Sequence, residues 1–285
     1  MKTLIIDSNY LGYAAAYTTG DLSHDDIATG VLFGFLSRIL SMGESFKTND
    51  FVFCWDSRSS KRRDKHSFYK EHRSKLDPEE AKRKAIIGKQ FKCLRRTILP
   101  KIGFQNVFVQ RGYESDDIVM KIVQEWKMED PIVITADEDL YQCLVSARVF
   151  LPNKKMMMTA NRFRQEYGIL PSSWARVKRI AGCSSDEVPG IVGVGEKTAI
   201  KFIKGKLKKD SVAYQKIVSE EGKAILRRNH SIVTLPFQGT EIPKRRKNEF
   251  SHGGLREVAL KYRMDSFLDG ERKEEWKRFF KGEFE

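Results

Sequence analysis

Acidic residues recur in this sequence where short apolar runs end. One Asp follows TLII, another follows FVFCW, and further acids follow VFVQRGY and PIVITA. Short apolar runs bounded by polar residues are typical of buried parallel strands. Helical periodicity separates these runs, which predicts an α/β fold with a mostly parallel sheet and helices on both faces. Because the carboxyl ends of parallel strands meet at one sheet edge, we expect the acids to lie together. They are Asp7, Asp56, Glu114, Asp116, Asp117, Asp137 and Asp139.

The same pattern predicts where the elements lie. Asp77, followed by a Pro and two Glu, is typical of a helix start, and Pro100 and Gly103 should end that helix. Asp139 is expected to cap a short helix. Strands are expected at 3–6, 51–55, 104–110, 131–136 and 149–151, with none after residue 159. Helices are expected at 25–45, 77–98, 115–126, 160–167, 172–181, 196–204, 211–219 and 221–231, and another should end the tail 264–280.

The charge balance favours a polyanionic partner. The 285-residue chain has a net charge of +14 and is 40% apolar. This predicts one large globular α/β domain or two small ones, with attraction to nucleic acid. A well-solvated basic surface without a partner is the alternative. The four cysteines form no CxxC pair, which favours reduced thiols. Because no signal-like or membrane-spanning run is visible, we expect a soluble cytoplasmic protein.

The clustered acids suggest a metal centre. A single Asp at a strand end is more often a helix cap than a ligand. Several carboxylates at one sheet edge, however, would repel each other and raise each other's pKa values. Hard divalent cations such as Mg²⁺ or Mn²⁺ are the natural compensation. Two such ions ~3.5–4 Å apart can hold a scissile phosphate and activate water. The absence of a Walker-type phosphate-binding motif disfavours a nucleotide-driven ATPase.

Two further stretches predict contacts with a nucleic-acid backbone. Residues 190–203, GIVGVGEKTAIKFI, place a Gly-Val-Gly turn before a helix, and the helix expected at 172–181 precedes that turn. Such a helix–hairpin–helix can bind a phosphate with backbone N–H groups, without reading bases. An ordinary structural turn is the alternative. Residues 58–75 are strongly basic and directly follow Asp56, although a solvated loop has the same composition.

In their order along the chain, these motifs resemble the structure-specific 5′ nucleases. This flap endonuclease and 5′→3′ exonuclease family includes phage replication enzymes and the 5′-nuclease domain of bacterial DNA polymerase I. The resemblance spans most of residues 1–205 and rests on IIDSNYL, FCWD with YKEHR, YESDDI, ITADEDLYQ and SSDEVPGIVGVGEKTA. It implies a PIN-like core and a metal-dependent hydrolase. Such an enzyme cleaves phosphodiesters near single-strand/duplex junctions during replication or repair.

The resemblance also implies roles for individual residues. One metal ion would be held by Asp7, Asp56, Glu114 and Asp116, with Asp117 close behind. A second would be held by Asp137, Asp139 and Asp186. Catalytic roles would fall to Lys70, Arg73 and Asp116, with the two basic residues on the scissile phosphodiester. Contacts to DNA are expected from Tyr10, Arg62, Arg63, Lys70, Arg73, Gly193, Gly195, Lys197 and Thr198. Tyr10 would stack on an unpaired base, with core packing as the alternative. A potassium ion is expected in the hairpin.

The domain layout follows from the same resemblance. The chain should form a single 5′-nuclease unit over 1–285 and act as a monomer. Within it, 1–168 would be the core, with a helical arch at about 58–100. Residues 169–235 would be the helix–hairpin–helix subdomain, and 236–285 would pack on the core. The expected partner is branched DNA with a 5′ single-stranded end. RNA–DNA hybrids and replication proteins are further candidates, and no membrane is expected.

One stretch departs from the family pattern. Relatives have Gly-Asp-x-Ser-Asp-Asn-x-Pro-Gly, whereas residues 182–190 place Cys183 at the first Asp and Glu187 at the Asn. A thiol is a poor ligand for Mg²⁺. We therefore expect a weakened second site, or one in which Glu187 substitutes. Two other hypotheses remain open: a branched-DNA-binding protein with weak or absent cleavage, and a PIN-like ribonuclease, against which the hairpin argues.

Overall fold

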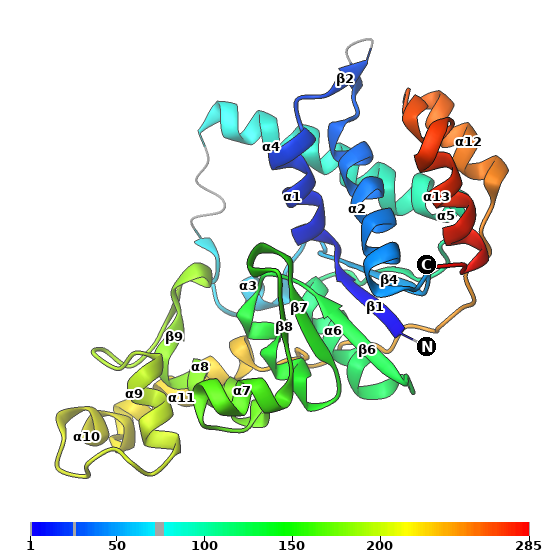
Figure 1. Ribbon diagram of the computed structural model, residues 1–285. Coiled ribbons are helices and arrows are strands. Elements are labelled where there is room, and N and C mark those ends of the chain that lie inside the picture. Colours follow the sequence, from blue (N-terminus) through cyan, green and yellow to red (C-terminus); the bar gives the residue numbers. More distant parts are fainter. Residues whose placement is uncertain (1, 25–26, 72–76, 285) are drawn as a thin grey trace.

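A six-stranded sheet lies at the centre of the molecule (Figure 1). The structure, a computed structural model, describes residues 2–24, 27–71 and 77–284. The strands are β1 (Lys2–Asp7), β4 (Phe51–Trp55), β5 (Val107–Val109), β6 (Asp130–Ile134), β7 (Arg148–Leu151) and β8 (Met156–Met158). Their order is β5-β4-β1-β6-β7-β8; β7 and β8 pair antiparallel and the other neighbours are parallel. The predicted α/β class with a mostly parallel sheet is confirmed.

Helices cover both faces of this sheet. Alternate residues of β1 point to opposite faces, so Leu4 and Ile6 enter one hydrophobic core and Ile5 enters the other. The first face is covered by α1 (Ser8–Thr19), α2 (Gly30–Phe46), α4 (Pro78–Cys93), α5 (Leu99–Ile102), α12 (His252–Lys261) and α13 (Gly270–Lys281). The second core is built from α6 (Ser115–Glu125), α7 (Ala160–Tyr167), α8 (Trp174–Ala181), α9 (Glu196–Ile203), α10 (Val212–Val218) and α11 (Glu220–Val233).

The remaining elements are short. They are α3 (Lys61–Lys65), the π-helix Leu94–Ile98, the hairpins β2 (Ser23–His24) with β3 (Ile27–Ala28) and β9 (Gly182–Cys183) with β10 (Val188–Pro189), and the 3₁₀ segments Glu138–Val145, Pro152–Lys154, Pro171–Ser173, Ser184–Asp186 and Asp265–Phe267. Helices α9 to α11 form one end of the molecule, and α12 and α13 lie at the opposite end (Figure 1). Within the described ranges, no helix is both long and apolar enough to span a membrane.

Several predicted element boundaries are wrong. Helix α2 begins at Gly30, because a two-stranded hairpin precedes it; residues 25 and 26 lie outside the described part. Pro100 does not end a helix. Residues 78–102 stay helical from α4 through the π-helix into α5, so Pro100 lies inside the helix, and Gly103, with φ +111°, ends it as predicted.

Other differences concern caps and unforeseen elements. The side chain that caps the segment after β6 is Asp137, which accepts the N–H of Asp139 at 2.8 Å, so the predicted cap was two residues late. The strand predicted at 104–110 is limited to β5. Strand β8, the β9–β10 pair and α12 were not predicted. The first two are too short to show a clear period of two.

Candidate functional site

The predicted acids line one cleft of about 1020 Å³ at the carboxyl edge of the sheet. Asp7 ends β1, and Asp56 directly follows β4. Glu114 caps α6, and Asp116 lies in its first turn. The register of the parallel strands brings these positions to the same edge, although they are far apart in the sequence. Seven of the predicted acids line the cleft, together with Glu80 and Glu138: Asp7, Asp56, Glu114, Asp116, Asp137, Asp139 and Asp186.

Hydrogen bonds fix the carboxylates of the first predicted group. Asp7 accepts hydrogen bonds from the hydroxyl of Thr135 at 3.0 Å, the hydroxyl of Ser115 at 3.3 Å and the N–H of Tyr10 at 3.2 Å. Asp56 accepts the backbone N–H of Ser115 at 2.8 Å. Hydrogen bonds from Ser115 therefore link the ends of β1 and β4 to the start of α6. Its place before two acids was the one feature of Ser115 that could have indicated this role.

Crowding of these carboxylates perturbs their ionisation. Burial, with the charge of Asp56, raises the pKa of Asp7 to about 6. Burial, with the charge of Asp139, raises the pKa of Asp137 to about 7. Burial, with the charges of Asp137 and Asp7, raises the pKa of Asp116 well above its usual range. The protein alone therefore leaves negative charge undercompensated, and hard oxygen-binding cations are the partners that would relieve it.

Without metal, Asp7→Asn should change stability in a pH-dependent way. The folded state raises the pKa of Asp7 from 3.8 to about 6. Protonated Asp7 therefore does not destabilise the folded protein below pH ~4, and ionised Asp7 destabilises it as the pH rises through 6. Asn cannot ionise. Relative to wild type, the variant should gain about 2–3 kcal/mol of unfolding free energy between pH 4 and pH 8. Urea unfolding with a chelator present measures this, and an equal gain at both pH values would contradict the raised pKa.

The second predicted group contains a thiol. Ligand atoms of Asp139, Cys183 and Asp186 lie within 4.8 Å of one another. Burial, with the charge of Asp139, raises the pKa of Cys183 to about 11, so the thiol is neutral at pH 7. A neutral thiol adds nothing to Mg²⁺ binding. Glu187, the predicted substitute, is not among the residues that line the cleft. The geometry therefore gives this group three carboxylates, with the hydroxyl of Ser185 also in the cleft and no fourth carboxylate from 182–187.

Lys178 is a site residue that the sequence analysis missed. Its ammonium lies 3.1 Å from Asp139 Oδ1 and 2.8 Å from Glu196 Oε1, and its side chain is buried. The buried Oδ1 of Asp139 accepts no hydrogen bond of good geometry from the described residues. Lys178 follows Trp174 and Val177 at helical spacing, on the buried face of α8. A lysine on an apolar helix face was the available signal.

Lys70 lies between the two acidic groups. Its ammonium is 2.8 Å from Glu114 Oε2 and 3.4 Å from Asp186 Oδ2. The hydroxyl of Tyr69 donates to the same Glu114 oxygen at 2.8 Å. Burial raises the pKa of Glu114, but the charges of Lys70 and Arg62 and the hydrogen bond from Tyr69 lower it. The net effect is a lowered pKa. Arg73, the second predicted basic residue, lies outside the described residues.

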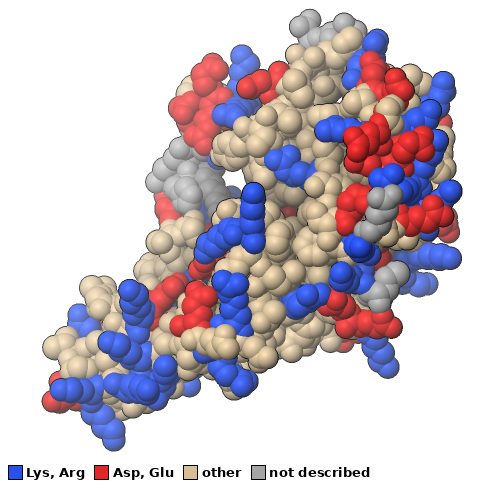
Figure 2. Space-filling model, in the orientation of Figure 1, with Lys and Arg blue, Asp and Glu red and all other residues tan. Residues whose placement is uncertain are grey.

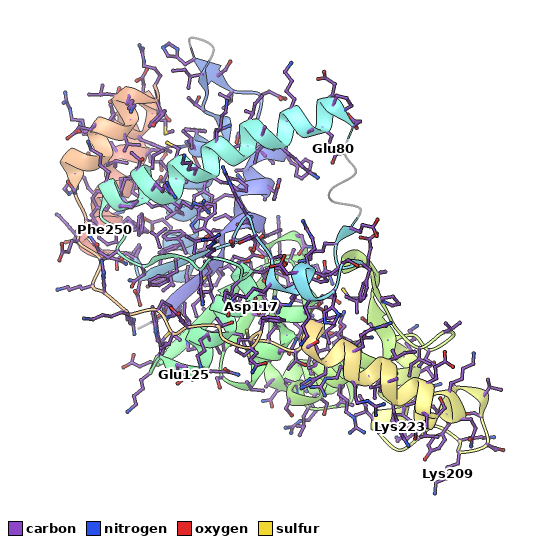
Figure 3. The ribbon with its side chains drawn as sticks, turned by 180° about the vertical axis from the view of Figure 1, so that it is seen from behind. Glu80, Asp117, Glu125, Lys209, Lys223 and Phe250 are labelled. Carbon is purple, nitrogen blue, oxygen red and sulfur yellow. The ribbon has the colours of Figure 1, made fainter. Side chains whose placement is uncertain are left out.

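Asp117 and Arg62 were placed wrongly in the predicted site. Asp117 is fully buried and binds both terminal nitrogens of Arg62, at 2.5 and 2.6 Å. It also accepts the backbone N–H groups of Glu114 and Phe237. Figure 3 shows Asp117 in the interior of the molecule. Asp117 does not line the acidic cleft, and Arg62 is 3% exposed. The geometry contradicts a metal-ligand role for Asp117 and a DNA-contacting role for Arg62.

The hairpin before α9 presents backbone and side chains to solvent. Gly193, with φ +82°, is exposed, and Gly195 precedes the first turn of α9. Lys197 is exposed and Thr198 is half-buried. Basic side chains gather over this end of the molecule (Figure 2). The exposed lysines of α9 and the loop after it are Lys197, Lys201, Lys204, Lys206, Lys208 and Lys209.

Aromatic side chains extend the acidic cleft along α1. Tyr10, Tyr13 and Tyr17 all line it, one helical turn apart. Tyr10 is half-buried, whereas Tyr17 is 79% exposed. Tyr13 packs edge-on against Phe91 of α4. The tyrosines therefore offer aromatic surface beside the acids, and the core-packing alternative holds only in part. Arg63, on α3, is exposed.

The chain is similar to known proteins in sequence and in fold. Residues 2–168 match the family model described as 5′-3′ exonuclease, N-terminal resolvase-like domain. The chain is 31% identical over 215 residues to the 5′-3′ exonuclease of Bacillus subtilis, covering 71% of this chain and 70% of that one. It is 29% identical to the thermostable DNA polymerase I of Thermus thermophilus, covering 71% of this chain but 24% of the polymerase.

Solved structures show the same fold. A bacteriophage T5 protein co-crystallised with metal ions superposes with a TM-score of 0.71 at 17% identity, covering 99% of this chain and 100% of that one. The bacteriophage T5 flap endonuclease, in a complex with DNA and metal ions, superposes with a TM-score of 0.68 at 16% identity, covering 99% of each chain. The family match and the acid-lined cleft define a nuclease, a hydrolase of phosphodiester bonds. More particularly, the chain belongs to the 5′-3′ exonuclease family.

Proposed function

We propose that this protein is a divalent-metal-dependent, structure-specific 5′ nuclease that cuts DNA near single-strand/duplex junctions, as in 5′ flaps. The observation that carries the proposal is a single cleft lined by nine carboxylates, Lys70 and the tyrosines of α1. The acids suit cations, the lysine suits a phosphate, and the aromatic rings suit an unpaired base. The phage T5 enzyme with the same fold was solved with DNA and metal ions.

The donor set fits a divalent cation. Asp7, Asp56, Glu114 and Asp116 would hold the first ion, because all four offer carboxylate oxygens to one cleft and burial raises the pKa of three of them. The second ion would be held by Asp137, Asp139 and Asp186. When bound, Mg²⁺ or Mn²⁺ supplies Lewis-acid charge at the phosphate and lowers the pKa of a bound water.

The protein's own groups then orient the substrate. Lys70 turns from Glu114 and Asp186 toward the scissile phosphate and stabilises charge that develops there. We propose the same role for Arg73. Tyr10 stacks on the unpaired base, and Arg63 contacts the strand that enters. The backbone N–H groups at Gly193 and Gly195, with Lys197 and Thr198, bind the duplex backbone, and potassium fits this hairpin.

We propose that the chain works as one monomeric unit. The nuclease core would comprise 1–168 with an arch at about 58–100, the duplex-binding part 169–235, and the stabilising C-terminal part 236–285. Burial of Phe267, Trp276 and Phe279 in the first core supports the last assignment. Bacterial relatives support a role in the cytoplasm of a bacterium or phage-infected host. RNA–DNA hybrids are further candidate substrates, and replication proteins are candidate partners.

A flap assay tests this function directly. A 5′-labelled flap DNA should be cut near its junction with Mg²⁺ and remain intact with a chelator, because the carboxylate cleft needs cations to bind the phosphate. Raising salt should weaken binding steeply. Flap binding without any product at micromolar enzyme would favour a branched-DNA-binding protein. Faster cleavage of RNA alone than of the flap would favour a ribonuclease.

Cys183→Asp should strengthen the second metal position. The substitution adds an oxygen ligand beside Asp139 and Asp186, where a neutral thiol now lies. We expect about 10-fold tighter binding of the weaker Mn²⁺ equivalent, comparable to single supporting-ligand effects at metal sites. Calorimetric titration of Mn²⁺ measures this, with Cys93→Asp, at a half-buried site away from the cleft, as the control. Wild-type protein that binds only one Mn²⁺, remote from Asp139 and Asp186, would contradict a second site.

A further inference from the structure

A second cavity lies at the opposite end of the molecule from the duplex-binding hairpin. It has a volume of about 360 Å³ and is formed by α12, α13 and the segment between them. Leu255, Phe267, Leu268 and Trp276 form an apolar floor. None of its lining residues belongs to the acidic cleft. Helices α12 and α13 occupy the end of Figure 1 away from α9–α11. A molecule held here would leave the nuclease cleft open.

The rim of this cavity is basic. Arg256, Lys273, Lys277 and Lys281 line it together with His252, and no acidic residue lines it. Lys277 pairs with Glu274 at 2.7 Å, and Lys281 lies 3.7 Å from Glu283. Arg256 and Lys273 are exposed and form no ion pair within the described ranges. Two cations beside an apolar floor thus form no ion pair among the described residues, and Lys273 lies close enough to Glu274 for their charges to interact.

The floor also contains an unused hydrogen-bond donor. The indole N–H of Trp276 is buried, and it donates no hydrogen bond within the part of the chain that the structure describes. Trp276 is 1% exposed and packs against Phe267 and Phe279. Because this N–H is buried, a molecule in the cavity does not reach it, and the floor meets a ligand as an apolar surface.

We propose that this cavity binds an acidic peptide segment of a partner protein that carries one bulky apolar side chain. The apolar side chain fills the floor between Phe267 and Leu268, and acidic residues pair with Arg256 and Lys273. The volume lies within the ~300–1,000 Å³ typical of ligand pockets, which suits one large side chain rather than a helix. Nucleic acid fits less well, because the floor aromatics are enclosed and offer no open stacking face.

Fluorescence anisotropy tests the proposal without DNA or metal, so the result is independent of nuclease activity. The probe is a short fluorescein-labelled peptide in which several Asp and Glu residues precede a single C-terminal Phe. It should bind saturably at one equivalent. Affinity should fall at least 10-fold for the R256E/K273E double variant, and at least 10-fold for wild type with a peptide in which Ala replaces Phe. Flap cleavage by R256E/K273E should stay at the wild-type rate.

A matched variant controls for overall charge. K127E/K261E reverses two exposed lysines that do not line the cavity, so it changes the net charge equally. It should bind the probe within about 2-fold of wild type, and thermal melts should show both double variants folded. Equal weakening by both variants, or equal binding of the Ala peptide, would overturn the proposal. So would displacement of the probe by a single-stranded oligonucleotide. A concentration-dependent dimer that only R256E/K273E loses would overturn it in favour of a second copy.

Discussion

Asp116→Asn should abolish flap cleavage while leaving flap binding intact. Asp116 lines the cleft between the two acidic groups, and the charges of Asp137 and Asp7 help to raise its pKa. Asn keeps the shape but removes the charge that would hold a cation. We expect a fall in the single-turnover rate of about 10²–10³-fold, the range for losing one electrostatic contribution at a phosphoryl site. Binding to the polyanion should persist or tighten, because one negative charge is removed from the cleft.

The comparison needs a variant that changes charge on the same helix but outside the cleft. Glu125→Gln serves this purpose, because Glu125 is exposed at the far end of α6 and pairs with Lys121. Figure 3 shows its position at the periphery of the molecule. Its cleavage rate should remain within about 2-fold of wild type. A normal rate for Asp116→Asn, measured in Mg²⁺ under single-turnover conditions, would remove Asp116 from the proposed site.

Asp117→Ala should destabilise the protein strongly. The substitution leaves the guanidinium of Arg62 buried without its partner and removes the acceptor for two backbone N–H groups. Burial alone would lower the pKa of Arg62, but the paired carboxylate outweighs it and raises that pKa above its usual value. Breaking a buried pair from one side costs about 3–5 kcal/mol. Urea unfolding without metal measures the change.

Two variants separate the ion pair from other effects. Arg63→Ala changes the neighbouring, exposed arginine and should cost less than about 0.5 kcal/mol. The double variant D117A/R62A should cost less than the sum of the single changes, because it leaves no unpaired charge. If Asp117→Ala instead kept full stability and lost a bound Mn²⁺, Asp117 would be a metal ligand and the correction drawn from the geometry would be wrong.

The sequence by itself determined the fold class and most of the acidic site. Apolar runs of strand length, each followed by an acid, predict a parallel sheet. They also predict the sheet edge at which the acidic side chains meet. Asp7 and Asp56 could be placed from this pattern, because the two relevant strands are buried and their ends are unambiguous. The departure at Cys183 was also visible, since the thiol replaces an acid within a short motif that retains Gly182, Ser185, Asp186, Pro189 and Gly190.

Only the tertiary structure decided which neighbouring residues point to the cleft. Asp116 and Asp117 are adjacent, but consecutive helix positions differ by ~100°, so one faces the cleft and the other faces Arg62. Arg62 was expected to contact DNA and Lys178 was not predicted to be in the site, and the burial of both depends on acids that are distant in the sequence. A local sequence pattern cannot identify the acid that pairs with either residue. Which residues line the cleft and which form buried ion pairs behind it is therefore decided only when the chain folds.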